Sequence, residues 1–148
     1  MTTFATNKKV YFNYEVLEKI EAGIELLGME VKSVKAGKVT LDGSHITIRG
    51  QEAYIIGADI SPFQPNNTPN EYDATRNRRL LLTKKELVEL ENTEGQKGLT
   101  IVPISMYSKA RKIKVEIAIV RGKKQFDKRQ SIKKRDTKRE IDRTLKNQ

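Results

Sequence analysis

The sequence predicts a single domain built mainly from β-strands with two short helices, followed by a basic C-terminal tail. The chain has 148 residues, which is the length of one domain. Short apolar segments bounded by Gly, Pro and Asn recur through the first 121 residues, and Lys112–Val120 alternates between β-branched apolar residues and mostly charged ones. The remaining residues are strongly basic and poor in large apolar side chains.

The first predicted elements are a strand and a helix. Tyr14–Ile20 mixes β-branched, aromatic and charged residues, which is typical of a strand, and Ile24–Leu27 continues it. Gly23 between them predicts a bend or a bulge. Met29–Ala36 has apolar side chains at helical spacing and is followed by Gly37, a common helix terminator.

The middle of the chain predicts a hairpin and a loop. His45–Ile48 and Ala53–Ala58 have the composition of strands, and Arg49–Glu52 between them has the composition of a hairpin turn. Ser61–Pro69 holds three of the four prolines. This composition predicts an irregular and mobile loop.

A second helix follows the loop. Thr83 and Glu86 have the spacing of a capping box, which places the start of a helix there. Apolar residues on one helical face begin at Leu87, and the helix is expected to end at Gly95 or Gly98.

The last two predicted strands are Leu99–Tyr107 and Lys112–Val120, which form a hairpin around Ser108–Arg111. The second of them has one wet and largely basic face. Several short antiparallel strands with a helix before the last hairpin are typical of a small closed barrel of the oligonucleotide-binding type. A β-sandwich is the alternative.

We expect residues 1–121 to form the barrel and residues 122–148 to form a separate tail. Residues 121–148 carry 12 basic and 4 acidic side chains, against 17 and 15 in residues 1–120, so most of the net charge of +10 lies at the C-terminus. The tail has too few apolar side chains to offset the entropy of ordering, which predicts disorder in the free protein. Its Lys, Arg, Gln and Glu residues are good helix formers, so we expect a helix when it binds a polyanion.

Composition excludes several kinds of chemistry. There is no cysteine, which excludes disulfides, Cys-based zinc sites and thiol catalysis. The single histidine, His45, stands before a strand, where a solvent-facing or hydrogen-bonded side chain is expected rather than a general base. The sequence shows no Gly-rich phosphate loop, nucleophile elbow or apolar run of membrane-spanning length. We expect no metal and no cofactor, and the absence of a secretory signal favours the cytoplasm.

Carboxylates leave one enzymatic alternative open. Glu21 and Glu30 could approach each other across the bend at Gly23, and Asp59 lies at a strand end, so a Mg²⁺-dependent RNA-processing enzyme could use them. None of the acids stands in a metal-binding run such as Asp-x-Asp. A non-enzymatic binding protein is the preferred interpretation.

The net charge indicates a polyanionic partner, either nucleic acid or an anionic membrane surface. The tail has no broad apolar face, which argues against the membrane. Basic side chains that could contact phosphates also recur in the body of the chain, at Lys32, Lys35, Lys38, Arg76, Arg78, Arg79, Lys112 and Lys114.

Several blocks of sequence then identify a family. In chain order they are Glu21–Ile24, Gly28–Ser33, Lys35–Gly37, Ile60–Pro62, Arg76–Leu82, Gly98–Pro103, Gly122–Arg129 and Ile132–Arg135. Together they resemble the small protein B family, the transfer-messenger RNA-binding proteins of bacterial ribosome rescue. The similarity covers nearly the whole chain.

The resemblance implies a barrel of the oligonucleotide-binding type that grips the tRNA-like domain of transfer-messenger RNA. Positions that match the family's RNA-contacting residues are Asn7, Glu21, Leu81, Lys114, Gly122, Lys123 and Lys124. The basic clusters add Lys8, Lys32, Lys35, Arg76, Arg78 and Arg79 as expected RNA contacts. Leu81 could pack on an unstacked base or fill the core. Glu21 is an anion, so it would accept a hydrogen bond from a base or a 2′-OH, or hold a neighbouring Lys.

The resemblance also implies that the tail enters the vacant mRNA channel of a stalled ribosome. Its role at the decoding centre would fall on Phe126, Asp127, Lys128 and Arg129, and its helix would begin at Ile132 and include Lys133, Lys134 and Arg135. The implied partners are transfer-messenger RNA, the ribosome and, indirectly through the charged RNA, an elongation factor, with the chain itself a monomer. A generic single-strand or ribosomal RNA-binding protein of similar fold is the alternative.

Overall fold

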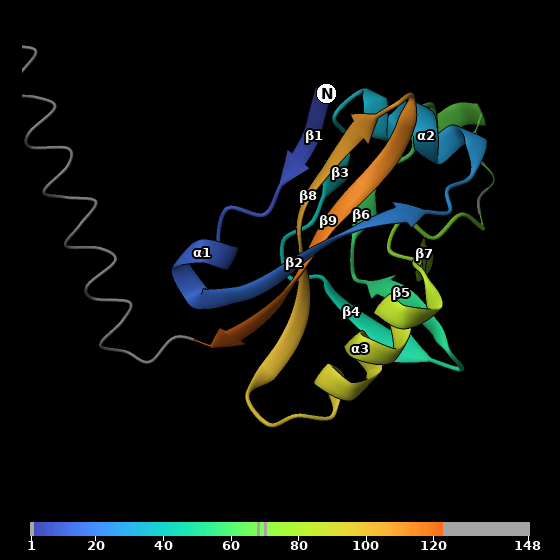
Figure 1. The fold of residues 1–148 in the computed structure, drawn as a ribbon. Coiled ribbons are helices and arrows are strands. Elements are labelled where there is room, and N and C mark those ends of the chain that lie inside the picture. Colours follow the sequence, from blue (N-terminus) through green and yellow to red (C-terminus); the bar gives the residue numbers. More distant parts are fainter. Residues whose placement is uncertain (1, 68, 70, 123–148) are drawn as a thin grey trace, which may run out of the picture.

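A seven-stranded antiparallel sheet forms the body of the computed structural model, which describes residues 2–67, 69 and 71–122 (Figure 1). The strand order is β1-β8-β9-β2-β7-β5-β4, and a second sheet pairs β3 with β6. The strands are β1 (Thr2–Thr6), β2 (Tyr14–Ile24), β3 (Val39–Thr40), β4 (His45–Arg49), β5 (Glu52–Ile56), β6 (Asp59–Ile60), β7 (Arg78–Leu81), β8 (Leu99–Lys109) and β9 (Lys112–Gly122). The helices are α1 (Val10–Asn13), α2 (Gly28–Lys35) and α3 (Lys84–Glu94), with a 3₁₀ turn at Pro65–Asn67.

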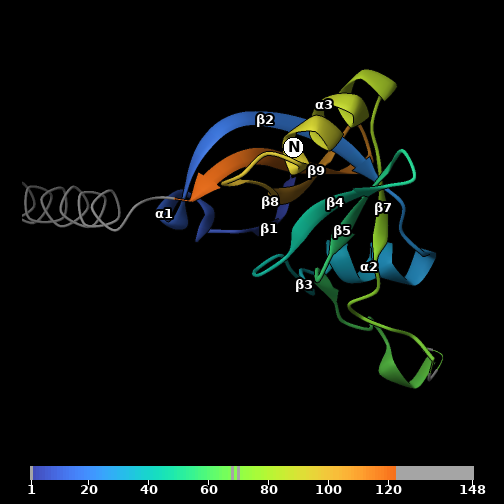
Figure 2. The same ribbon diagram turned by 90° about the horizontal axis from the view of Figure 1, so that it is seen from below.

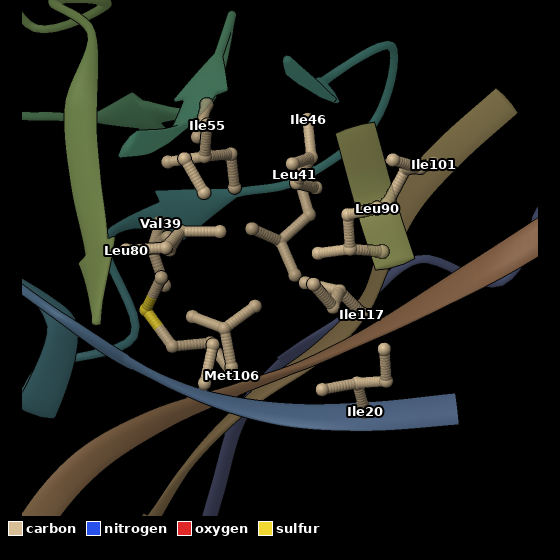
Figure 3. Packing of buried hydrophobic residues seen from close by; sticks show 14 of the residues in the cluster. Ile20, Val39, Leu41, Ile46, Ile55, Leu80, Leu90, Ile101, Met106 and Ile117 are labelled. Carbon is tan, nitrogen blue, oxygen red and sulfur yellow. The ribbon is translucent and has the colours of Figure 1, made fainter. Parts of the chain in front are cut away.

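The large sheet curls around a single main core. The long strands β2, β8 and β9 arch over the shorter strands β4, β5 and β7 (Figure 2), and β4 packs against β8. Figure 3 shows Ile20 and Ile117 from the long strands facing Ile46 and Ile55 from the short ones. Helix α3 packs against β4 and β8 and adds Leu90 to this core. Burial of these apolar side chains is the main stabilising contribution to the fold.

A smaller apolar cluster holds the N-terminal segment. Val10 of α1 packs with Val102 and Ile104 of β8 and with Ala118 and Val120 of β9. Helix α1 is thereby fixed beside the end of β9, where the described part of the chain stops (Figure 1).

The mainly β architecture with short helices is confirmed. Closure of the barrel is not, because the sheet order ends at β1 and β4 and no described pairing joins these two strands. The sheet is curled by packing of β4 on β8, rather than by a ladder of hydrogen bonds that removes both edges.

Both predicted helices and both predicted hairpins are present. The Thr83 hydroxyl accepts a hydrogen bond from the Glu86 N–H at 3.2 Å, and the Glu86 carboxylate accepts one from the Thr83 N–H at 2.9 Å, so the capping box is confirmed. Helix α2 ends before Gly37, which has a φ of +78°. Both hairpins turn through two residues with positive φ, as type I′ turns do, although the second turn uses Ala110 and Arg111 rather than glycine.

The prediction of a bulge at Gly23 is wrong. Strand β2 runs without interruption from Tyr14 to Ile24, and its register shift lies between Val16 and Glu18. The predicted strand at Ile24–Leu27 is also wrong, because the chain leaves the sheet after Ile24 and enters α2. The sequence patterns did not predict β1, α1, β3, β6 or β7 as elements.

The described part of the proline-rich segment 61–69 forms no strand, as expected, and its mobility stays a prediction. Residues 123–148 lie outside the described residues, so the disorder and the induced helix of the tail also stay predictions. Within the described ranges, no helix is long and apolar enough to cross a membrane.

Candidate nucleic-acid interface

One face of the large sheet collects several of the predicted RNA-contacting residues. In antiparallel pairs, residues directly opposite each other carry their side chains on the same face. Leu81 of β7 pairs with Gly23 of β2, Gly23 with Lys114 of β9, and Lys114 with Tyr107 of β8, so four strands form one row. The adjacent row pairs Glu21 with Glu116.

Between these two rows the side chains point the other way. Ala22, Val115 and Met106 are almost completely buried in the core. The two rows therefore belong to the convex side of the sheet. We call this side the outer face and define it by Glu21, Leu81, Tyr107, Lys112, Lys114 and Glu116.

Position 23 requires glycine because the Leu81 side chain approaches the backbone there closely. A Cβ atom added at Gly23 would lie 3.2 Å from the Leu81 Cβ and 3.3 Å from its Cδ1. The Leu81 side chain therefore lies over the bare backbone of β2, and 47% of Leu81 remains exposed. Of the two predicted roles for Leu81, filling the core is wrong, and an apolar contact surface remains available for a ligand.

A basic groove of about 350 Å³ runs beside Leu81 between residues of α2 and of the β8–β9 hairpin. Its lining residues are Gly23, Ile24, Leu26, Val31, Lys35, Leu81, Arg111, Lys112, Ile113 and Lys114. The charged residues of this lining are all cationic, and the rest are apolar apart from the glycine backbone. The cationic side chains at the rim attract phosphates, and an unstacked base can pack on the apolar floor.

A second hollow of about 720 Å³ adjoins the groove, because both are lined by Ile24 and Leu26. It also contains Arg76 and Arg79, but acids balance their charge. Arg79 forms ion pairs with Glu25 at 3.0 Å and Glu52 at 3.5 Å. The positive potential is therefore concentrated in the groove rather than in the second hollow.

Glu21 stands on the outer face beside these cations. The Tyr107 hydroxyl donates a hydrogen bond to Glu21 Oε2 at 2.5 Å, and Lys109 Nζ lies 3.3 Å from the same oxygen. The Tyr107 hydrogen bond and the Lys109 ammonium hold the pKa of Glu21 below its ordinary value. The predicted interaction of Glu21 with a neighbouring lysine is thus present, and Tyr107 is a second donor to the same carboxylate.

The structure corrects the prediction that Arg78 contacts RNA. Its side chain is completely buried, and its guanidinium donates to Glu30 Oε2 from Nε at 2.8 Å and from Nη2 at 2.6 Å. It also donates to the backbone oxygens of Ala58, Ala74 and Arg76. A buried cation with these partners holds the fold together and is not available to a phosphate.

Glu30 is the buried anion of this cluster, which Arg76 and Tyr72 complete. The carboxylate accepts hydrogen bonds from Arg76, from Tyr72 at 3.1 Å and from the Leu27 N–H at 2.8 Å. Burial alone would raise the pKa of Glu30, but the Arg76, Leu27 and Arg78 donors outweigh it and lower the pKa to about 2. Arg76, also predicted to bind RNA, is therefore largely engaged within the protein.

The other predicted residues are divided between the groove and more distant surfaces. Lys35 lines the groove, whereas Lys32 is exposed on α2 but is not part of the lining. Asn7 is buried, and its side-chain amide donates to the Pro103 oxygen at 3.2 Å, so it ties the N-terminal segment to β8. Lys8 is exposed beside it. Gly122 ends β9, and the predicted contacts from Lys123 to Arg135 lie outside the described residues.

Of the three carboxylates considered for a metal site, Glu21 and Glu30 hold separate partners, and Asp59 has a buried Oδ1 without a hydrogen bond to any described residue. Glu30 is bonded to arginines, and Glu21 to Tyr107 and Lys109. Among the described residues, no group of three or more His, Asp or Glu side chains is arranged to hold a metal ion.

Sequence reasoning missed Tyr107, Arg111 and Gly23 as parts of this surface. The sequence does not indicate that Tyr107 lies on this surface, because most of Leu99–Tyr107 is apolar and shows no alternation. The sequence pattern predicts only a turn at Arg111. The position of Gly23 beneath Leu81 depends on the pairing of β2 with β7, which the sequence did not predict.

Comparison with known proteins now identifies the family. The family model described as SmpB protein matches residues 4–147. The chain belongs to the SmpB family. An SsrA-binding protein from Malacoplasma penetrans (strain HF-2) is 48% identical to this SmpB-family chain over 140 residues, which cover 95% of each protein. Another from Elusimicrobium minutum (strain Pei191) is 46% identical over 143 residues, covering 97% of this chain and 90% of the relative.

A solved structure has the same fold as this SmpB-family chain. It is described as "tmRNA-SmpB: a journey to the center of the bacterial ribosome" and aligns with a TM-score of 0.68 and 41% identity. The alignment covers 81% of this chain and 84% of the solved one. The resemblance found in the sequence is therefore confirmed.

Proposed function

We propose that this chain is a transfer-messenger RNA-binding adaptor of ribosome rescue. The family match, the SsrA-binding relatives and the similarity to the solved tmRNA-SmpB structure all support this function. Its partners are transfer-messenger RNA and the ribosome.

The observation that carries the proposal is the convergence of Lys35, Arg111, Lys112 and Lys114 around the exposed Leu81. A groove with cationic walls and an apolar floor suits a folded RNA that presents phosphates and an unpaired base. The tRNA-like domain would lie across the outer face. The curled sheet supports classing the fold with barrels of the oligonucleotide-binding type, which bind nucleic acids on a strand face.

The chain divides into two functional parts in this proposal. Residues 1–121 bind the RNA, and residues 122–148 probe the empty mRNA channel. The high density of basic side chains in the tail supports binding to ribosomal RNA. Phe126 would stack on a ribosomal base at the decoding centre.

We assign no catalytic step to this chain. GTP hydrolysis belongs to an elongation factor that arrives with the charged RNA, and peptide tagging follows from the RNA itself. Because its proposed site of action is the ribosome, we expect the protein to act in the cytoplasm.

Reconstituted translation tests this function directly. On an mRNA that lacks a stop codon, adding the full chain together with charged transfer-messenger RNA should yield tagged peptide. A chain that ends at Arg121 should bind the tRNA-like domain with little loss but should yield no tagged peptide. Equal loss of RNA binding and of tagging would contradict the division into two parts, and absence of tagging with the full chain would contradict the function.

A further inference from the structure

Glu21 is an anion on a surface that is otherwise suited to phosphates. It lies on the outer face two residues from Gly23, whose backbone lines the groove, and 37% of its side chain is exposed. A carboxylate in this position repels phosphates and lowers RNA affinity unless it accepts a hydrogen bond from the RNA. The position of Glu21 therefore requires a hydrogen-bond donor on the RNA.

The two oxygens of Glu21 have different surroundings. Tyr107 and Lys109 both contact Oε2, at 2.5 Å and 3.3 Å. None of the hydrogen bonds among the described residues involves Oε1. One oxygen is thus fixed by the protein, and the other has no hydrogen-bond partner among the described residues.

Tyr107 is buried beneath the surface of the outer face. It pairs with Lys114, in the row that continues through Gly23 to Leu81, but only 5% of Tyr107 is exposed. Its ring offers almost no area to a ligand. Its hydroxyl can influence RNA only through the carboxylate that it holds.

We propose that Tyr107 is a positioning residue for RNA recognition, which orients Glu21 so that Oε1 accepts a hydrogen bond from an N–H group of an unpaired base packed on Leu81. This inference rests on the proposed function and names the class of group that the site reads. Leu81 lies beside Gly23, so a base on Leu81 presents its edge toward Glu21, two residues along β2. All four RNA bases carry such N–H donors when unpaired: adenine at N6, cytosine at N4, guanine at N1 and N2, and uracil at N3.

The electrostatics are consistent with this geometry. Lys109 and Lys114 face Glu21 as cations and Glu116 faces it as an acid, and together with the Tyr107 hydrogen bond the net effect is to lower the pKa of Glu21. Burial and the neighbouring Glu21 carboxylate raise the pKa of Tyr107. At neutral pH the carboxylate is therefore ionised and the tyrosine keeps its proton, as the proposed hydrogen bond requires.

A double-mutant cycle in the full chain tests the proposal. The affinity for the tRNA-like domain is measured by titration at about 150 mM salt, where charge alone contributes less. Tyr107→Phe should weaken binding about tenfold in the wild-type background and less than about twofold in the Glu21→Met background, which lacks the acceptor oxygens. Tyr14→Phe removes a hydroxyl at the opposite end of β2 from Gly23 and serves as the matched control, with affinity unchanged.

A second readout separates positioning from a structural role. NMR titration of the Glu21 carboxyl should show a pKa below the ordinary value in the wild-type chain and a return toward that value in Tyr107→Phe. Loss of stability alone would not produce this shift, and thermal unfolding of each variant records the stability separately.

Three results would overturn the inference while leaving the proposed function intact. These are a wild-type affinity in Glu21→Met, a Tyr107→Phe effect of equal size in both backgrounds, and an unchanged Glu21 pKa in Tyr107→Phe. Loss of binding only when the contacted nucleotide lacks its 2′-OH would assign Oε1 to the ribose instead. Failure of the wild-type chain to bind the tRNA-like domain would contradict the proposed function itself.

Discussion

Replacing Arg78 with Met removes the cation at the centre of the buried cluster while keeping a side chain of similar length. Three backbone oxygens, those of Ala58, Ala74 and Arg76, lose a donor at 2.9 to 3.1 Å. The Glu30 carboxylate keeps Arg76 and Tyr72 but loses its fully buried partner.

The expected loss of stability is large. The buried Ala58 oxygen, left without this donor, costs about 1 kcal/mol or more, whereas the Ala74 oxygen keeps the Ile60 N–H at 3.0 Å. Removing one member of a buried ion pair costs about 3–5 kcal/mol, and the remaining Arg76 contact favours the lower end of that range. We therefore expect Arg78→Met to lower the free energy of unfolding by about 4 kcal/mol, a large fraction of the roughly 5–15 kcal/mol typical of a domain.

Urea unfolding at pH 7, followed by circular dichroism, measures this loss. Arg79→Met is the matched control, because Arg79 is the next residue in β7 and its side chain is 43% exposed and paired only at the surface. The control should lose less than about 1 kcal/mol. A loss below about 1 kcal/mol in Arg78→Met would refute the structural role of Arg78. Unchanged stability with weakened RNA binding would restore Arg78 as an RNA contact.

Three further predictions concern pH, the approach of Leu81 and the groove cations. The pKa of Glu30 is about 2 in the folded protein against an ordinary value near 4.5, so its contribution to stability is complete above about pH 4.5 and is lost as the pH falls toward 2. Urea unfolding across this range should show a fall in stability that is smaller in Glu30→Gln, where the lowered pKa of Glu21 still contributes, and equal slopes would contradict the assignment. Gly23→Ala should push Leu81 aside, weakening RNA affinity several-fold with a stability change below about 1 kcal/mol, because Leu81 is exposed and can move. Unchanged affinity in a titration would show that Leu81 does not contact the RNA. Lys114→Ala should reduce the slope of log affinity against log salt concentration by about 1, and an unchanged slope would exclude a phosphate contact.

The parts of the fold that depend on short-range signals could be predicted from the sequence. Alternation in Lys112–Val120, the capping box at Thr83 and Glu86, and the glycine after α2 each mark a local structure that the chain forms. These signals work because the physical cause lies within a few residues of the position concerned.

Strand β7 shows why other parts could not be predicted. Its residues Arg78, Arg79, Leu80 and Leu81 alternate between buried and exposed, but two arginines followed by two leucines give no alternating pattern in the sequence. Burial of Arg78 depends on Glu30, which lies 48 residues away along the chain. Such a long-range ion pair inverts the usual expectation that a cation faces solvent.

The candidate site was predicted in part. The family resemblance predicts Leu81 and Lys114 as RNA contacts, and the basic cluster on the first helix predicts Lys35. The structure brings all three to one groove. Tyr107 could not be named, because its role depends on reaching Glu21 across β9. Asn7 was expected at the RNA surface, but its amide is used to join the N-terminal segment to β8.

A competition titration tests most directly whether the outer face recognises a tRNA-shaped RNA. Labelled tRNA-like domain of transfer-messenger RNA, bound to the full chain at about 150 mM salt, is challenged with excess ordinary tRNA and with excess single-stranded RNA. Recognition of shape by the groove and the outer face predicts that the label resists both competitors. Displacement by either competitor at near-equal concentration would contradict it and would leave a generic RNA-binding protein that acts through charge alone.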